Sequence, residues 1–249
     1  MKRNLTVALF VMFLALCYTS PAQSFVFTDA FTSGINPYWW TAYVSGNNSI
    51  DTTGGNVKMV QMENGTLGSG LGFNFQVPGD FIAEVDWTLN TGPILNGERI
   101  GLTSGFGAVE RIEWNASNTW QLYLTHFFNE PGQLQGHTTT TDTSGKFQFT
   151  RSGSTLSGSF WNGSGWTLIH SWTHAGNTVA TTLGFSIWPD NYTGVDNFGT
   201  TVTFDNFYLN VPGWNGPPTP PTGVPEPTTM LLLGLGLMGL AGVRRKIQK

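Results

Sequence analysis

The stretch from Phe81 to Leu89 reads FIAEVDWTL, and it decides the fold class. Apolar and polar residues alternate along it, which is the period of a β-strand with two different faces. Glu84 and Asp86 fall on the polar face. The apolar face, which we expect to meet a core, carries Phe81, Ala83, Val85, Trp87 and Leu89.

Similar short runs recur along the chain, separated by turn residues. Ser152-Gly153 and the four residues Asn162–Gly165 are typical of hairpin turns. No amphipathic helix is evident between the strands. We therefore predict an all-β body, an antiparallel two-sheet β-sandwich of the jelly-roll type. The other predicted strands are Ala108–Trp114, Thr119–Phe127, Lys146–Arg151, Thr155–Trp161, Trp166–Trp172, Thr181–Trp188 and Thr201–Leu209.

The composition agrees with this fold class and excludes several functions. Charged residues make up 10% of the chain and aromatic residues 14%, a mixture that favours strands and turns over helices. Between residues 25 and 212, fourteen acidic side chains against five basic ones give a formal charge of −9. Such a surface repels nucleic acid, so nucleic-acid binding is excluded.

The amino terminus predicts export. Lys2 and Arg3 precede an uncharged apolar run from Leu5 to Cys17, and Ala22 and Ser24 fit the small residues of a cleavage site. We predict a signal peptide with its helix over residues 1–24. Cys17 is the only cysteine, so the mature chain can form no internal disulfide.

The carboxy terminus predicts a membrane segment. A proline-rich linker over residues 212–223 leads into an apolar stretch, which basic residues follow at once. By the positive-inside rule, these basic residues favour a cytoplasmic end and place the body outside the inner membrane.

This end resembles a PEP-CTERM sorting signal over residues 224–249. The resemblance implies a Gram-negative host, processing by an exosortase-like membrane enzyme, and a helix that anchors the chain in the inner membrane transiently. The mature protein would then reach the cell surface or the extracellular matrix of a biofilm. The residues that carry the resemblance are Val224, Pro225, Glu226 and Pro227, with Arg244, Arg245 and Lys246 at the end.

The body, residues 25–211, is similar to concanavalin A-like (laminin G-like) jelly rolls. Phe27–Phe31 opens it, Phe147–Leu156 and Trp161–Trp166 lie in the middle, and Val202–Phe207 closes it. This fold hosts lectins, hydrolases and adhesion modules alike, so the resemblance implies the fold and leaves the function open.

Glu84 and Asp86 are candidates for contact with sugar. Laminarinase-type enzymes of a similar fold carry a second glutamate further along such a strand, but Thr88 and Leu89 stand there. Retaining glycosidases need two carboxyl groups about 5 to 5.5 Å apart. The pair is therefore a solvated polar face, a sugar-binding group, or half of a catalytic site that Glu110 or Glu113 would have to complete.

A second candidate is the loop that starts at Trp188. Its carboxylate, amide and aromatic side chains suit sugar hydroxyls and rings, or a calcium ion, although such residues also serve turns. Trp161, Trp166 and Trp188 stand beside turns and are candidate stacking platforms. The loop residues that we assign to a glycan are Trp188, Asp190, Asn191 and Tyr192.

Asp29 and Asp205, in the strands that open and close the body, are candidates for a structural calcium site. Taken together, the sequence favours a non-catalytic glycan-binding or structural module of the cell surface or exopolysaccharide matrix, with polysaccharide as its partner. The alternative is a divergent glycoside hydrolase or lyase of the same fold.

Overall fold

A computed structural model describes residues 23–62, 68–90, 98–114, 120–131, 136–189 and 200–218. The predicted sorting signal lies outside these residues, as do Asp190, Asn191 and Tyr192. Of the predicted signal peptide, only Gln23 and Ser24 are described, and Ser24 pairs with Pro212 in a sheet. The chain forms two compact units, one up to Gly216 and a second one from Pro217. None of the helices among the described residues is long and apolar enough to cross a membrane.

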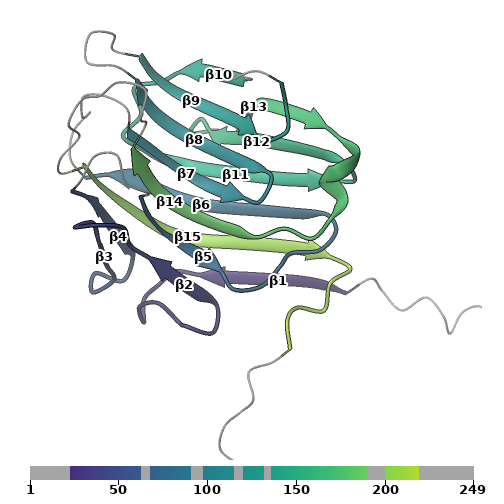
Figure 1. The fold of residues 1–249 in the computed structure, drawn as a ribbon, viewed down its shortest axis with the longest axis horizontal. Coiled ribbons are helices and arrows are strands. Elements are labelled where there is room, and N and C mark those ends of the chain that lie inside the picture. The colour runs from purple at the N-terminus through teal and green to yellow at the C-terminus, as the bar shows by residue number, and fades with distance from the viewer. Residues whose placement is uncertain are drawn as a thin grey trace, which may run out of the picture. The chain divides into compact units, whose positions relative to one another are not determined.

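The body is a sandwich of two antiparallel sheets, which confirms the predicted fold class (Figure 1). Sheet A has eight strands, and sheet B has seven. In spatial order, sheet A contains β13 (Trp166–Thr173), β12 (Thr155–Trp161), β11 (Ser144–Ser152), β6 (Phe81–Leu89), β15 (Thr200–Pro212), β4 (Val57–Gln61) and β3 (Ser49–Asp51), with β1 (Ser24–Asp29) also paired to β15. Sheet B contains β10 (Gly136–Thr139), β9 (Trp120–Phe127), β8 (Gly107–Trp114), β7 (Glu98–Ser104), β14 (Leu183–Pro189), β5 (Ser69–Phe73) and β2 (Trp40–Tyr43).

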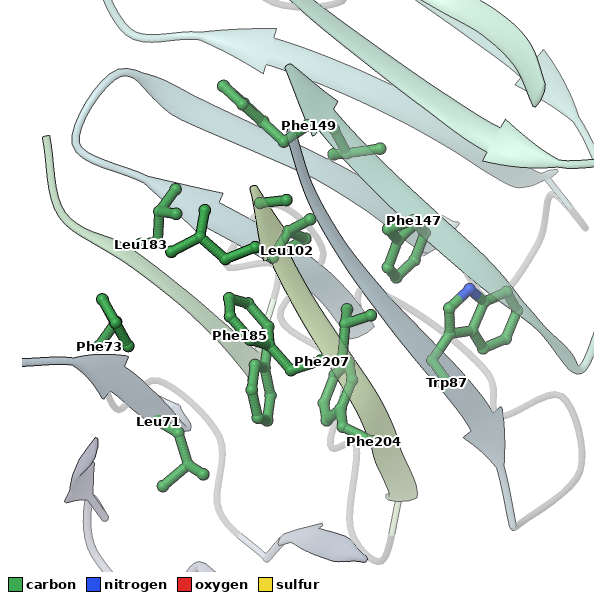
Figure 2. Packing of buried hydrophobic residues seen from close by; sticks show 14 of the residues in the cluster. Leu71, Phe73, Trp87, Leu102, Phe147, Phe149, Leu183, Phe185, Phe204 and Phe207 are labelled. Carbon is green, nitrogen blue, oxygen red and sulfur yellow. The ribbon is translucent and has the colours of Figure 1, made fainter. Parts of the chain in front are cut away.

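Strand β6 has the two faces that its sequence predicts. Its first four predicted core residues are buried, whereas Glu84 and Asp86 are partly exposed. Aromatic rings from both sheets fill the space between the layers. Figure 2 shows Trp87 and Phe147 from sheet A, with Phe185 of sheet B near Phe204 and Phe207 of sheet A.

The predicted hairpin turns are also present. Ser152 pairs with Thr155, and Gly153 between them has a φ of 58°, which glycine adopts without strain. In the next turn, Asn162 Oδ1 accepts hydrogen bonds from the backbone N–H groups of Ser164 and Gly165. The only helix among the described residues is η1 (Ala175–Thr178), a single 3-10 turn.

The long strand β15 holds the two ends of the body together. Its first half pairs with β4 and its second half with β1, so the purple first strand and the yellow-green last strand lie side by side (Figure 1). A bulge between Asp205 and Tyr208 separates the two halves. Beyond β15, the Trp214 ring packs edge-on against Phe25 at 4.8 Å.

Candidate functional site

The residues predicted to contact sugar lie on opposite outer faces of the sandwich. In β14, Phe185 and Ile187 enter the core, so Ser186 and Trp188 point away from it on the outer face of sheet B. In β6, the buried Val85 and Trp87 put Glu84 and Asp86 on the outer face of sheet A. The structure therefore does not bring Trp188 together with the acidic pair.

A row of paired residues crosses the outer face of sheet B. The residues come from five adjacent strands, β2, β5, β14, β7 and β8, which meet only through the fold. In order across the sheet, the row contains Tyr43, Gly70, Ser186, Gly101 and Glu110. Together with the neighbouring Trp188, Arg99 and His126, we call it the glycine face.

At Gly70 and Gly101, only backbone atoms form the surface between the larger neighbouring side chains. A Cβ atom at Gly101 would lie 3.1 Å from the Cη2 atom of Trp188 and 3.1 Å from the Cγ atom of Glu110. A Cβ at Gly70 would collide with the Tyr43 hydroxyl. Glycine therefore allows the Trp188 indole and the Tyr43 hydroxyl to approach the sheet closely.

Tyr43 is half-exposed, yet its hydroxyl end is covered. The ring reaches from the edge strand over Gly70 toward Ser186. Burial of the hydroxyl raises the pKa of Tyr43, although a hydrogen bond with the Ser186 side chain acts in the opposite direction. The phenol is therefore neutral at physiological pH and can both donate and accept a hydrogen bond.

Glu110 is a carboxylate with no exposed surface that nevertheless points outward from sheet B. Arg99 Nη1 donates a hydrogen bond to its Oε2 at 3.2 Å, and His126 Nδ1 lies 3.0 Å from its Oε1. A hydrogen bond between this ring nitrogen and Oε1 joins the imidazole to the Glu110 side chain. The guanidinium and the imidazole thus hold the buried charge in place, next to the Trp188 ring.

Glu84 and Asp86, the acidic pair of sheet A, also have polar partners within the protein. Asp86 Oδ1 lies 2.7 Å from Lys146 Nζ, and its Oδ2 accepts from Asn206 Nδ2 at 3.0 Å. Glu84 Oε1 accepts from Gln148 Nε2 at 2.7 Å. Glu110 lies on the other sheet, and packed sheets are about 10 Å apart, so Glu110 cannot complete a catalytic pair with either residue. The side chain of Glu113 lies outside the described residues.

The predicted calcium ligands have protein partners. Asp29 Oδ1 accepts from the Phe31 backbone N–H at 2.8 Å, and its Oδ2 accepts from Trp40 Nε1 at 2.9 Å. Asp205 Oδ1 accepts from the Asn206 backbone N–H at 2.7 Å. No group of three or more metal-binding side chains occurs in the part of the chain that the structure describes. Calcium at these two residues stays a prediction.

Sequence reasoning missed most of the glycine face. Tyr43, Arg99 and His126 stand alone in their segments, and nothing in the sequence shows that they meet. One signal was present in β5, which reads SGLGF. Its glycines alternate with Leu71 and Phe73, which are buried in the core, so they occupy the opposite face together.

Comparison with known proteins supports both the sorting signal and the fold. Residues 223–246 match the PEP-CTERM protein-sorting motif, which includes all seven residues assigned to it. Such a motif implies export and membrane-anchored sorting by an exosortase. No curated protein sequence matches the chain.

Several solved structures resemble the body at low sequence identity. The CBM2 module of the evolved Dit of Lactobacillus casei BL23 phage J-1 has a TM-score of 0.57 at 12% identity, over 79% of this chain and 100% of the module. A lectin from Bauhinia forficata, in complex with GalNAc, has a TM-score of 0.52 at 9% identity, covering 77% and 100%. LamAcat from Zobellia galactanivorans has a TM-score of 0.52 at 13% identity, covering 74% and 96%. These likenesses show the fold alone, an all-β jelly-roll sandwich.

Proposed function

We propose that this protein is an exported surface or exopolysaccharide-matrix component of a Gram-negative bacterium, whose body binds glycan on the glycine face without cleaving it. The observation that carries the proposal is the Trp188 ring lying against Gly101, beside the fixed charges of Glu110 and Arg99. A sugar ring has apolar C–H faces and a rim of hydroxyl groups. An aromatic ring flanked by oriented donors and acceptors matches both.

The composition of the face supports a neutral ligand. Glu110 offsets the Arg99 charge, and the hydroxyls of Tyr43 and Ser186, which are hydrogen-bonded to each other, are neutral. The whole body carries a formal charge of −9, which disfavours polyanions. Fold likeness to a lectin crystallised with GalNAc is consistent with saccharide binding but does not identify the sugar.

A glycan array tests this proposal. The full chain, purified in mild detergent, is applied with and without calcium beside two variants. We expect Trp188→Ala to weaken binding by about tenfold, because the ring contact is lost. Leu168→Ala removes an exposed apolar side chain from sheet A and serves as the matched control. A folded protein that binds no glycan on the array would leave a purely structural role.

Cleavage of a polysaccharide at the same face is the second candidate function. A buried carboxylate beside a histidine is an arrangement that enzymes use for proton transfer, and Glu110 with His126 provides it. New reducing ends or unsaturated sugars after incubation with a polysaccharide would reveal this activity. It should disappear in Glu110→Gln, and absence of product from every polysaccharide that binds would dismiss it.

The proposed location of the protein outside the cell can be tested separately, through the sorting signal. If an exosortase processes the chain near Pro225–Pro227, Glu226→Ala should accumulate at full length in the inner membrane of the host. The natural chain should appear outside the cell in a shortened form. Equal processing of both chains would show that this motif does not direct the cleavage.

A further inference from the structure

The outer face of sheet A holds a pocket that contains no residue of the glycine face. It has a volume of about 470 Å³ and lies where β6, β11 and β12 approach the turn after Trp161. Its lining includes Asp86, Asp142, Lys146 and Trp161. Pockets of roughly 300 Å³ and more are large enough for small-molecule ligands.

The strand register explains why these residues share one surface. Asp86 pairs with Lys146 across β6 and β11. Because Phe147 pairs with Phe160, Lys146 lies beside Trp161 on the next strand, and Trp161 pairs with Trp166 on β13. The two indole rings meet at 5.5 Å in an edge-to-face contact, which holds Trp161 next to the charged pair.

The polar groups around the pocket are oriented by the protein. Asp86 is held between Lys146 and Asn206, so its position is set before any ligand arrives. Asp142 Oδ2 accepts a hydrogen bond from the Tyr123 hydroxyl at 2.8 Å. The Asp86 carboxylate and the Lys146 ammonium group are 28% and 43% exposed as side chains, so both remain open to a ligand.

We propose that this pocket is a second saccharide site, which takes one or two neutral sugar rings. Sugar hydroxyls would donate to the carboxylates of Asp86 and Asp142 and accept from Lys146, while Trp161 packs against a ring. Two acidic groups against one basic group leave the site negatively charged, and this disfavours uronic acids.

Two saccharide sites on opposite outer faces would make the protein a cross-linker of polysaccharide chains. This consequence rests on the proposed function of the glycine face, whereas the pocket itself does not. A protein that binds two segments of one polymer is held more strongly than either site alone would hold it, because the second binding event is intramolecular.

NMR titration of the tryptophan indole N–H signals separates the two sites. The full chain in detergent is titrated with cellotetraose, laminaritetraose and maltotetraose, and with tetragalacturonate as the anionic comparison. Substitution assigns the Trp161 and Trp188 signals. We expect a neutral tetrasaccharide to shift both signals, and Trp188→Ala to abolish only the shifts at the glycine face.

The matched pair Asp86→Asn and Glu84→Gln tests the pocket directly. Both residues point outward from β6, but only Asp86 lines the pocket. We expect Asp86→Asn to weaken binding at Trp161 by about tenfold, as loss of a charged hydrogen-bond acceptor does. Glu84→Gln should leave it unchanged.

Each result decides between the two sites. Shifts at Trp188 alone would overturn the pocket proposal and leave the proposed function standing. Shifts at Trp161 alone would support the pocket but overturn the glycine face and the cross-linking role. Stronger binding of tetragalacturonate at Trp161, equal losses in both β6 variants, or no shift at either tryptophan with any saccharide would overturn the proposal of a neutral saccharide site.

Discussion

At the scale of single residues, Arg151 is a charge that stabilises the body from inside. It is 2% exposed, and its guanidinium donates hydrogen bonds to the backbone carbonyls of Val77, Gly79, Asn177 and Val179. Burial lowers the pKa of this guanidinium from its very high usual value. Through these bonds, one side chain links the end of β11 to two irregular segments. One segment precedes β6, and the other surrounds η1.

We expect Arg151→Met to lower the free energy of unfolding by about 3 kcal/mol or more, because buried carbonyls lose their donor. Urea unfolding followed by tryptophan fluorescence measures the change. Arg151→Lys retains the charge without the planar fork of donors, so it should recover only part of the loss. Lys58→Met, at a more exposed position, controls for removal of a positive charge. Full recovery by lysine would show that charge alone matters.

At the scale of elements, strands could be predicted where apolar and polar residues alternate along the sequence, because such a strand has one apolar and one polar face. β6 and β12 match their expected bounds, and β8 extends only one residue earlier than expected. Strands such as β4 and β5 were not predicted, because they are five residues long and β5 contains two glycines. Glycine in a short run resembles a turn in sequence, and this segment forms a strand through its pairing with β2 and β14.

The bulge in β15 is an element-scale feature with a testable cost. Asn206 has a φ of 50°, a left-handed conformation that alanine adopts at a cost of about 1–2 kcal/mol. Asn206→Ala should therefore reduce the free energy of unfolding by about that amount, as measured by chemical denaturation. Asn206→Gly relaxes the backbone and loses only the hydrogen bond to Asp86, so it should be less destabilising. A glycine variant as unstable as the alanine variant would refute the backbone explanation.

At the scale of the whole molecule, the candidate site was harder to predict than the fold. Trp188 was predicted as a candidate because this aromatic residue stands at the end of a clear strand. Asp86 was predicted because this acidic residue lies on the polar face of another clear strand. Their separation onto two surfaces depends on which sheet each strand joins, and local patterns do not determine that. Tyr43 and Glu110 are far apart in the sequence and share one row only because five strands align.

The negative charge of the whole body disfavours anionic ligands. A formal charge of −9 between residues 25 and 212 should keep polyanions away at low salt, where long-range repulsion is strongest. Binding of a neutral glycan involves no net charge on the ligand. Its Kd should therefore change by less than about twofold between about 0.05 and 1 M NaCl, measured by calorimetry on the full chain. Alginate, as an anionic comparison, should bind weakly at low salt. If alginate instead binds tightly and is released by salt, Arg99 and its neighbours on the glycine face would be acting as an anion site, and the neutral-glycan proposal would fail.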